Sequence, residues 1–456
     1  MLRFLLYFAL VLVGISMVTA DGQYGAEALL VVILLAGIAV FIFRRYSNEK
    51  SFITYIFLAA LCVRLIFGLL IHVFEIREFV GLDSLGYDVT ASKISDYWMG
   101  YIPEDPNLTW LLAVRGPGWG MNYLIGFLYL TLGKSIFVVQ SIFAVVGAAT
   151  IPLVYFCSER IFHNKSVARA TAIGVAFFPP FIIWSGQMLK DGLIVFLLVL
   201  AMMMVLQIQR KFTFAGAVAL IISLTGILSL RFYIFYMVSV AVVAGFIIGL
   251  DTSFKDVVRR VSILVGIGLV LIYFGMIRVA TVDLDTYASF ERLQVSRLDQ
   301  ATSGDSGFAS DQDVSTVGGA LGVLPIGFAY LMFAPFPWEM KNFRQSITLP
   351  DILLWWSMIP LLIYGLWYAI KHRLRASLPI LIFTFLLTIS YSVFQGNVGA
   401  AYRQRTQIQV FLFMFIAVGW GLIREKIEDK RAVETNRRNE LNRHLKTRLQ
   451  EQQRAT

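Results

Sequence analysis

Long apolar runs recur along the chain from its first residues to about residue 424. Each run has about 17–23 residues, the length that a helix needs to cross a hydrocarbon layer about 30 Å thick. The runs are continuous, whereas strands of a membrane barrel alternate apolar and polar positions. Twelve runs have this character: 4–20, 25–43, 52–74, 136–157, 166–186, 190–208, 212–230, 232–250, 261–279, 352–370, 377–394 and 406–424. The pattern predicts an all-α polytopic membrane protein with about twelve transmembrane helices.

The composition supports the same class. Hydrophobic residues make up 58% of the 456 residues and charged residues only 15%, with a mean hydropathy of +0.73. A soluble domain of this length would be far more polar. The net charge of +10 is typical of a membrane protein whose cytoplasmic loops collect Lys and Arg. Membrane lipids are therefore expected around the chain, and no nucleic acid partner is.

The basic clusters between the runs predict the topology. They lie at 44–50, 159–165, 210–211, 255–260, 371–375 and in the tail from residue 424. If every apolar run crossed the membrane, these clusters would alternate between its two sides, against the positive-inside rule. The conflict disappears if Trp119–Leu132 and Val317–Phe336 do not cross. We interpret both as juxtamembrane or re-entrant helices on the outer side.

This topology places both termini in the cytoplasm and the long loops 75–135 and 280–351 outside. Residues 1–423 then form one integral-membrane domain. Residues 424–456 form a basic helical tail with ten basic and six acidic residues, as expected of a solvated helix near anionic lipid headgroups. Residues 1–20 fit either a first span or a cleaved signal peptide ending at Val18-Thr19-Ala20, and both readings leave Asp21 outside.

Several common chemistries have no sequence signature here. Cys62 and Cys157 fall inside predicted spans and form no disulfide framework. The four His residues lack metal-ligand spacing, and no Walker loop or GxGxxG motif occurs. A soluble nucleotide-binding domain is therefore not expected.

Polar residues that are unusual in such a chain gather on the predicted outer side. In chain order they are Asp83, Tyr87, Asp88, Lys190, Asp191, Arg231, Trp338, Glu339, Tyr402, Arg403 and Arg405. Ionisable residues at the membrane boundary are costly and commonly functional. Their convergence on one face predicts an active site at the membrane–water boundary.

The two acids each have two readings. Asp83 is suited to accept a proton from an acceptor hydroxyl or to help hold a metal ion, or alternatively to cap a helix. Asp191, beside Lys190 in a tight turn between two apolar runs, is suited to catalysis or, alternatively, to capping the next span while Lys190 reaches toward water.

The arginines and aromatic residues also have alternatives. Arg231, Arg403 and Arg405 lie on the side where arginines do not set topology, and a guanidinium binds phosphate well. Alternatively they form ion pairs with Asp83, Asp191 or Glu339. Tyr87, Tyr402 and Trp338 suit either a sugar ring or an interfacial aromatic belt.

The segment Leu82–Asp191 resembles the membrane glycosyltransferases of the GT-C superfamily, in particular bacterial relatives of the protein O-mannosyltransferases and aminoarabinose transferases. The resemblance depends on Leu82-Asp83-Ser84 and Tyr87 in the first outer loop and on the helix region Gly116–Ser135. It continues through VQSIFAVVGAATIPLVYFCSERIF, the Pro-rich Phe177–Pro180 and MLKDGLIVF. The late segments FAPFPWEM and GNVGAAYRQRTQIQVF are similar to membrane proteins of polysaccharide gene clusters.

The resemblance implies a GT-C-like fold, with Asp83 and Asp191 as the two catalytic acids. It implies a polyprenyl-phosphate sugar as donor and a lipid-linked glycan, polysaccharide or protein as acceptor, at the outer face of the plasma (inner) membrane. Ser84 follows the first acid where relatives often have a second acid, so a divalent cation, Mg²⁺ or Mn²⁺, stays an open question. The alternatives are a polymerase or ligase that joins lipid-linked repeats through arginines, and a non-enzymatic flippase for lipid-linked oligosaccharides.

Overall fold

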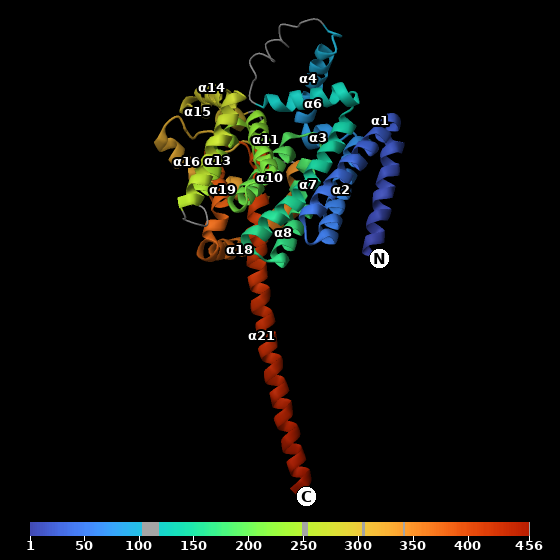
Figure 1. Cartoon of the computed structure of the whole chain (residues 1–456), viewed down its shortest axis with the longest axis vertical. Coiled ribbons are helices and arrows are strands. Elements are labelled where there is room, and N and C mark those ends of the chain that lie inside the picture. The colour runs from blue at the N-terminus through green and yellow to red at the C-terminus, as the bar shows by residue number, and fades with distance from the viewer. Residues whose placement is uncertain (103–117, 249–253, 303–305, 341–342, 456) are drawn as a thin grey trace.

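The computed structural model describes residues 1–102, 118–248, 254–302, 306–340 and 343–455. Within these ranges the chain is built from helices and contains no strand, only one isolated bridge between Gly307 and Asn397. The helices form one bundle, with α4 (Asp83–Trp98) and α6 (Trp119–Leu132) at its upper end (Figure 1). The last helix leaves the lower end. The centre of the first predicted outer loop, residues 103–117, and the end of the predicted span 232–250 lie outside the described residues.

The first two predicted spans form a hairpin within α1 (Leu2–Tyr46). Asp21 and Gly22 leave helical geometry, Gly22 with φ 51°, a conformation that glycine adopts without steric cost. A Cβ on Gly14 would lie 3.2 Å from the side chain of Leu29. The two halves of α1 therefore pack against each other, and Asp21 lies at their turn.

The core of the bundle surrounds α7 (Ile136–Phe162), most of whose residues are buried. Against it pack α1, α2 (Lys50–Val73), α8 (Lys165–Phe177) and α10 (Lys190–Arg210). The remaining elements are α3 (Arg77–Gly81), α9 (Pro179–Ser185), α11 (Phe214–Leu230), α12 (Phe232–Ile248), α13 (Phe254–Tyr273), α14 (Met276–Tyr287), α15 (Phe290–Thr302), α16 (Val317–Phe333), η1 (Pro337–Glu339), α17 (Phe343–Ser346), α18 (Leu349–His372), α19 (Leu374–Phe394), α20 (Val398–Gln404) and α21 (Thr406–Ala455).

Two predicted spans are broken. The run 166–186 bends by 57° between α8 and α9, where Pro179 and Pro180 have no N–H to donate. The run 261–279 bends by 77° between α13 and α14, where Gly275 has φ 73°. Each of these two runs therefore consists of two helices joined at a bend, which hydropathy does not reveal.

Arg64, in the middle of α2, bonds to the break between α8 and α9. It is buried and donates to the carbonyl of Ala176 at 3.3 Å and to Oγ of Ser185 at 2.8 Å. The carbonyl of Ala176 would otherwise face Pro180, which cannot donate. Arg64 is not among the residues selected from the sequence, and its guanidinium contacts the break from mid-span.

The described residues contain seven helices long and apolar enough to cross a membrane, or nine if each bent pair counts as one span. The helices α11, α12 and α16 are apolar but shorter. The chain is therefore a helical membrane protein by the length and composition of its helices. The predicted number of twelve spans is not confirmed.

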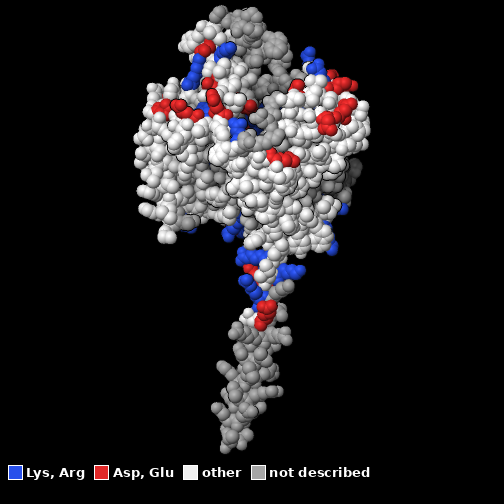
Figure 2. Space-filling view, turned by 180° about the vertical axis from the view of Figure 1, so that it is seen from behind, with Lys and Arg blue, Asp and Glu red and all other residues white. Residues whose placement is uncertain are grey.

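Contacts between polar side chains mark the two ends of the bundle. At the lower end Glu49 forms an ion pair with Arg169 of α8. At the upper end Oδ2 of Asp21 lies 3.3 Å from Nε2 of His72, near the end of α2. Most of the bundle surface is uncharged, and charged side chains gather near the upper end and where α21 leaves the lower end (Figure 2). Helix α21 is buried at its start and continues away from the bundle to Ala455 (Figure 1).

Candidate active site

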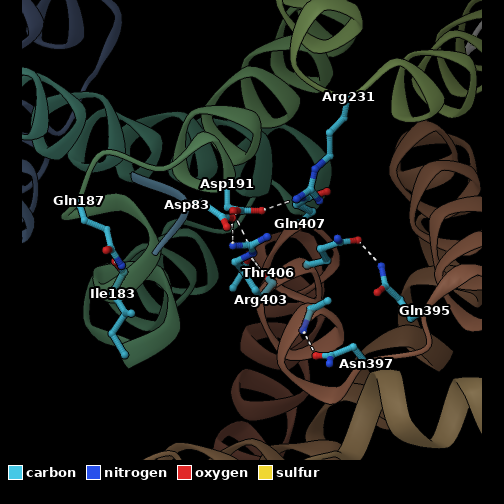
Figure 3. A network of polar contacts seen from close by, with 12 residues as sticks. Asp83, Ile183, Gln187, Asp191, Arg231, Gln395, Asn397, Arg403, Thr406 and Gln407 are labelled. Atoms are coloured by element: carbon cyan, nitrogen blue, oxygen red, sulfur yellow. Dashed lines mark hydrogen bonds and ion pairs between the residues drawn. The ribbon is translucent and has the colours of Figure 1, made fainter. Parts of the chain in front are cut away.

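Four charged residues from distant parts of the chain meet in one network of ion pairs (Figure 3). One of them begins α4, at the upper end of the bundle (Figure 1). Asp83 is the first residue of α4, and Asp191 lies in the first turn of α10. Arg231 separates α11 from α12, and Arg403 lies near the end of α20. We call these four residues the acid–arginine cluster.

Asp191 is the buried centre of this cluster, with a side chain that is 1% exposed. Its Oδ1 accepts a hydrogen bond from Nη2 of Arg231 at 2.9 Å, and its Oδ2 lies 3.2 Å from Nε of Arg403. Leu189 is extended, so α10 begins at Lys190 and places Asp191 where free N–H groups and the helix dipole favour a negative charge. Two cations and a helix terminus together offset the burial of this carboxylate.

Arg231 is held in place by residues of α19 and α21. It has extended backbone between two helices and is 5% exposed. Its Nη1 donates to the hydroxyl of Tyr391 at 3.4 Å, and that hydroxyl donates to Oε1 of Gln407 at 2.6 Å. The sequence reasoning did not select Tyr391 or Gln407, because both lie among apolar residues without a charge to mark them.

Arg403 connects the buried acid to the accessible one. Its Nη1 donates to Oδ2 of Asp83 at 2.6 Å, while its Nε faces Asp191. The Asp191 carboxylate, and next that of Asp83, raises the pKa of the Arg403 guanidinium above its usual value. Arg403 therefore keeps its charge and fixes the distance between the two acids.

Asp83 is the accessible member of the cluster, with a side chain that is 47% exposed. The N-cap residue of α4 is Leu82, and that of α10 is Leu189, and neither helix has a side-chain cap. The capping alternative for Asp83 and Asp191 is therefore not what the structure shows. The alternative of ion pairs with Arg231 and Arg403 is the observed arrangement.

Two further candidates lie beside the cluster. Tyr87 is one helical turn beyond Asp83 on α4, and burial, followed by the charges of Asp83 and Asp191, raises the pKa of its phenol. The hydroxyl is therefore a neutral donor. Lys190 adjoins Asp191, and its Nζ lies 3.2 Å from where a Cβ on Gly118 would stand, so glycine at this position leaves room for the ammonium group.

Asp88 points away from the cluster. It accepts a hydrogen bond from the hydroxyl of Tyr129 at 2.5 Å, which joins α4 to α6. Five residues separate Asp88 from Asp83, which is about 140° around a helix. The two acids of the first loop therefore contact different partners.

Tyr402 and Arg405 also lie apart from the cluster. Tyr402 donates to Oδ2 of Asp351 at 3.0 Å. Arg405 is fully buried, and its Nη1 donates to the carbonyls of Met332 and Ala334 at 2.9 and 3.0 Å. Burial lowers the pKa of Arg405 to about 10. Its observed contacts hold the end of α16 and are not directed at Asp83 or Asp191.

Trp338 and Glu339 belong to η1, beside a separate cavity. Glu339 accepts a hydrogen bond from the hydroxyl of Tyr330 at 3.1 Å, and the ring of Trp338 stacks on Phe336. Neither residue has an ion pair to the cluster among the contacts of the described chain.

A divalent cation does not fit the donor set of the cluster. Mg²⁺ and Mn²⁺ need several oxygen ligands, whereas Asp83 and Asp191 both face arginine nitrogens. Within the described ranges no three His, Cys, Asp or Glu residues lie close enough together to hold a metal ion.

In comparisons with known proteins, no protein family, no curated protein and no solved structure matches this chain. The function proposed below therefore depends on the geometry of the cluster.

Proposed function

We propose that this protein transfers a sugar from a polyprenyl-phosphate donor to an acceptor at the outer face of the plasma membrane. The acceptor is a lipid-linked glycan, a polysaccharide or a protein. The observation that carries the proposal is the meeting of two acids and two arginines from four distant segments at helix ends on one side of the bundle. Such a preorganised set of charges suits a reaction in which charge develops on a phosphate.

The proposal includes the twelve-span topology. The two halves of α1 count as two crossings, each bent pair counts as one, α11 and α12 cross, and α6 and α16 do not. The positive-inside rule then places the lower end, with its Arg and Lys residues, in the cytoplasm. The acid–arginine cluster faces the periplasmic or extracytoplasmic side, where the lipid-linked donor is reached sideways from the membrane.

The chemistry assigns one role to each residue. The acceptor hydroxyl gives its proton to the Asp83 carboxylate as its oxygen bonds to the anomeric carbon of the sugar. The bond from that carbon to the phosphate oxygen breaks, and the lipid phosphate keeps the electron pair. Arg403, Arg231 and Lys190 balance the charge on the departing phosphate, and Asp191 positions both arginines.

Arg403 also couples donor binding to the base. In the structure it pairs with Asp83, and a bound phosphate competes for the same guanidinium. Release of Asp83 from Arg403 frees its carboxylate to accept a proton. Binding of the donor phosphate therefore makes the Asp83 carboxylate available as the base.

A polymerase or ligase that joins lipid-linked repeats is the second candidate. The observation that favours it is that Arg231 and Arg403 both contact Asp191, so a positively charged pair exists without the help of Asp83. In that case Arg403 is essential and Asp83 is dispensable.

The test uses purified full-length protein, a radiolabelled polyprenyl-phosphate sugar pool, and the variants Asp83→Asn and Arg403→Ala. Asp96→Asn is the matched control, because Asp96 lies on the same helix and pairs with Lys134, away from the cluster. We expect Asp83→Asn to stay folded and lose transfer at least about 100-fold, while Asp96→Asn keeps it. Full transfer by Asp83→Asn with none by Arg403→Ala supports the polymerase instead. No transfer or hydrolysis by the wild type contradicts both.

A further inference from the structure

A cavity of about 350 Å³ lies between the second long loop, the end of α16 and the start of α20. Its volume is within the range of small-molecule sites, which are mostly apolar with a few placed polar groups. The residues that line it include Phe308, Tyr330, Phe336, Trp338, Glu339 and Val398.

Aromatic rings form the walls of this cavity in two stacked pairs. Tyr330 stacks on Phe308 with ring centres 4.1 Å apart, and Trp338 stacks on Phe336 at 5.1 Å with planes 15° apart. Tyr330 meets Phe336 edge to face at 5.3 Å. The ring of Trp338 also lies 6.3 Å from that of Trp356, but Trp338 is 74% exposed, so most of its indole is open to a ligand.

The polar groups of the cavity are few and lie at the ring edges. Oε1 of Glu339 and the hydroxyl of Tyr330 are 3.1 Å apart, so both are oriented before any ligand binds. Gln345 and Ser306 also line the cavity. Flat apolar faces with acceptors and donors at their rim match a pyranose ring, which has apolar C–H faces and hydroxyl groups around its edge.

Backbone contacts fix one wall of the cavity to the start of α20. The N–H of Phe308 donates to the carbonyl of Gly396, and the N–H of Val398 to that of Ser306, both at 2.9 Å. Val398 lines the cavity at the start of α20, and Arg403 follows five residues later, about 7–8 Å along a helix. One short helix therefore joins the cavity to the cluster.

We propose that this cavity binds a neutral pyranose ring, and that this ring belongs to the acceptor glycan. That the ring belongs to the acceptor glycan rests on the proposed function. That the cavity binds a pyranose ring does not. The stacked pairs position the ring, and Glu339 and Tyr330 select its hydroxyl pattern. Helix α20 connects this ring site to Arg403, which pairs with Asp83.

An interfacial aromatic belt is the competing explanation for Trp338. The chain offers a matched control in Trp367, which is 50% exposed and stacks on Tyr364 with ring centres 5.9 Å apart. Trp367 lies near the far end of α18, close to Lys371, and lines no part of the cavity. If both tryptophans served only as interfacial anchors, replacing either one would have the same effect on sugar binding. A sugar site in the cavity predicts an effect only for Trp338.

The test is saturation-transfer NMR on full-length protein in lipid nanodiscs, titrated with methyl glucopyranoside, mannopyranoside, galactopyranoside and N-acetylglucosaminide. At least one pyranoside is expected to bind saturably. Trp338→Ala weakens that binding about 10-fold or more, and Trp367→Ala leaves it within about 2-fold of the wild type. Glu339→Gln, which preserves the ring stacks, is the second variant and changes which pyranoside binds best.

Absence of saturable binding to every pyranoside, or equal weakening by Trp338→Ala and Trp367→Ala, overturns the proposal. Asp83→Asn is expected to bind the pyranoside as the wild type does. Wild-type protein that binds a pyranoside but transfers no sugar contradicts the proposed function and keeps the cavity. Wild-type protein that transfers sugar without binding any pyranoside supports the proposed function and contradicts the pyranose site in the cavity.

Discussion

The upper and lower ends of the bundle each have a carboxylate that holds arginines, in very different surroundings. At the lower end Glu49 binds Arg169 with two hydrogen bonds of 2.6 and 2.7 Å, and Arg169 is 49% exposed. At the upper end Asp191 and Arg231 are almost completely buried, and Arg403 is shared with a second acid. In the lower pair the arginine is exposed and Glu49 is 12% exposed. In the upper cluster Asp191 and Arg231 are sealed from water, whereas Arg403 and Asp83 reach it.

This difference in burial changes how much of each arrangement stability can explain. An exposed pair costs little to form and adds about 0–1 kcal/mol of stability. A buried pair loses several kcal/mol of hydration for each ion, and apolar residues often replace it without loss of stability. Stability alone therefore explains the pair of Glu49 and Arg169 but not the acid–arginine cluster, whose burial suits a site that holds charges ready for a reaction.

The largest expected effect is that of Asp191→Asn. It leaves Arg231 buried without its counter-charge, so we expect a loss of roughly 3–5 kcal/mol in the free energy of unfolding. Thermal unfolding of the purified protein, followed by intrinsic fluorescence, measures it. Asp191→Leu combined with Arg231→Met is expected to recover part of the loss, and a double variant less stable than Asp191→Asn contradicts the burial argument.

Arg405→Ala comes next and contrasts with Arg403→Ala. Arg405 is a buried charged donor to two carbonyls, so its loss is expected to cost about 2 kcal/mol or more in unfolding free energy. Arg403 reaches solvent, so its loss is expected to lower transfer about 100-fold or more with a smaller change in stability. Thermal unfolding and transfer assays on both variants check this pair. A large loss of transfer with Arg405→Ala and a large loss of stability with Arg403→Ala would instead place Arg405 in the site.

The smallest effect concerns Glu49. Hydrogen bonds from Arg169 lower the pKa of its carboxyl, so the carboxylate form stabilises the fold. A lowered folded pKa gives stability that is present above the unfolded value, 4.5 for this carboxyl, and lost as the pH falls through the folded value. Glu49→Gln is therefore expected to cost about 0.5–1 kcal/mol at pH 7 and progressively less below pH 4.5. A constant difference between the two proteins at every pH contradicts this.

The length and continuity of the apolar runs were enough to predict a helical membrane protein. They were not enough to predict the breaks at Phe178 and Gly275, because the runs stay apolar through both bends. The short α6 was predicted with its observed ends, Trp119 and Leu132, since the conflict between the basic clusters and the positive-inside rule singled it out. The number of spans depends on which short helices cross, and hydropathy does not decide that.

The sequence indicated which side of the bundle holds the candidate site. It did not separate the residues that form the site from those that lie nearby. Asp83, Asp191, Arg231 and Arg403 do meet, whereas Asp88 and Arg405 face other partners. Arg403 and Arg405 are two residues apart, about 200° around a helical path, so one contacts the acids and the other the end of α16. Spacing alone does not tell which, because the answer depends on how α20 packs.

The most direct measurement compares transfer by Asp83→Asn with transfer by Glu49→Gln, under identical conditions and after both variants are shown to be folded. Each removes one carboxylate that pairs with an arginine, one at each end of the bundle. If the acid–arginine cluster is the active site, we expect about 1% or less of wild-type transfer for Asp83→Asn. Glu49→Gln is then expected to keep near wild-type transfer. Equal transfer by the two variants would show that the upper cluster is structural, like the lower pair.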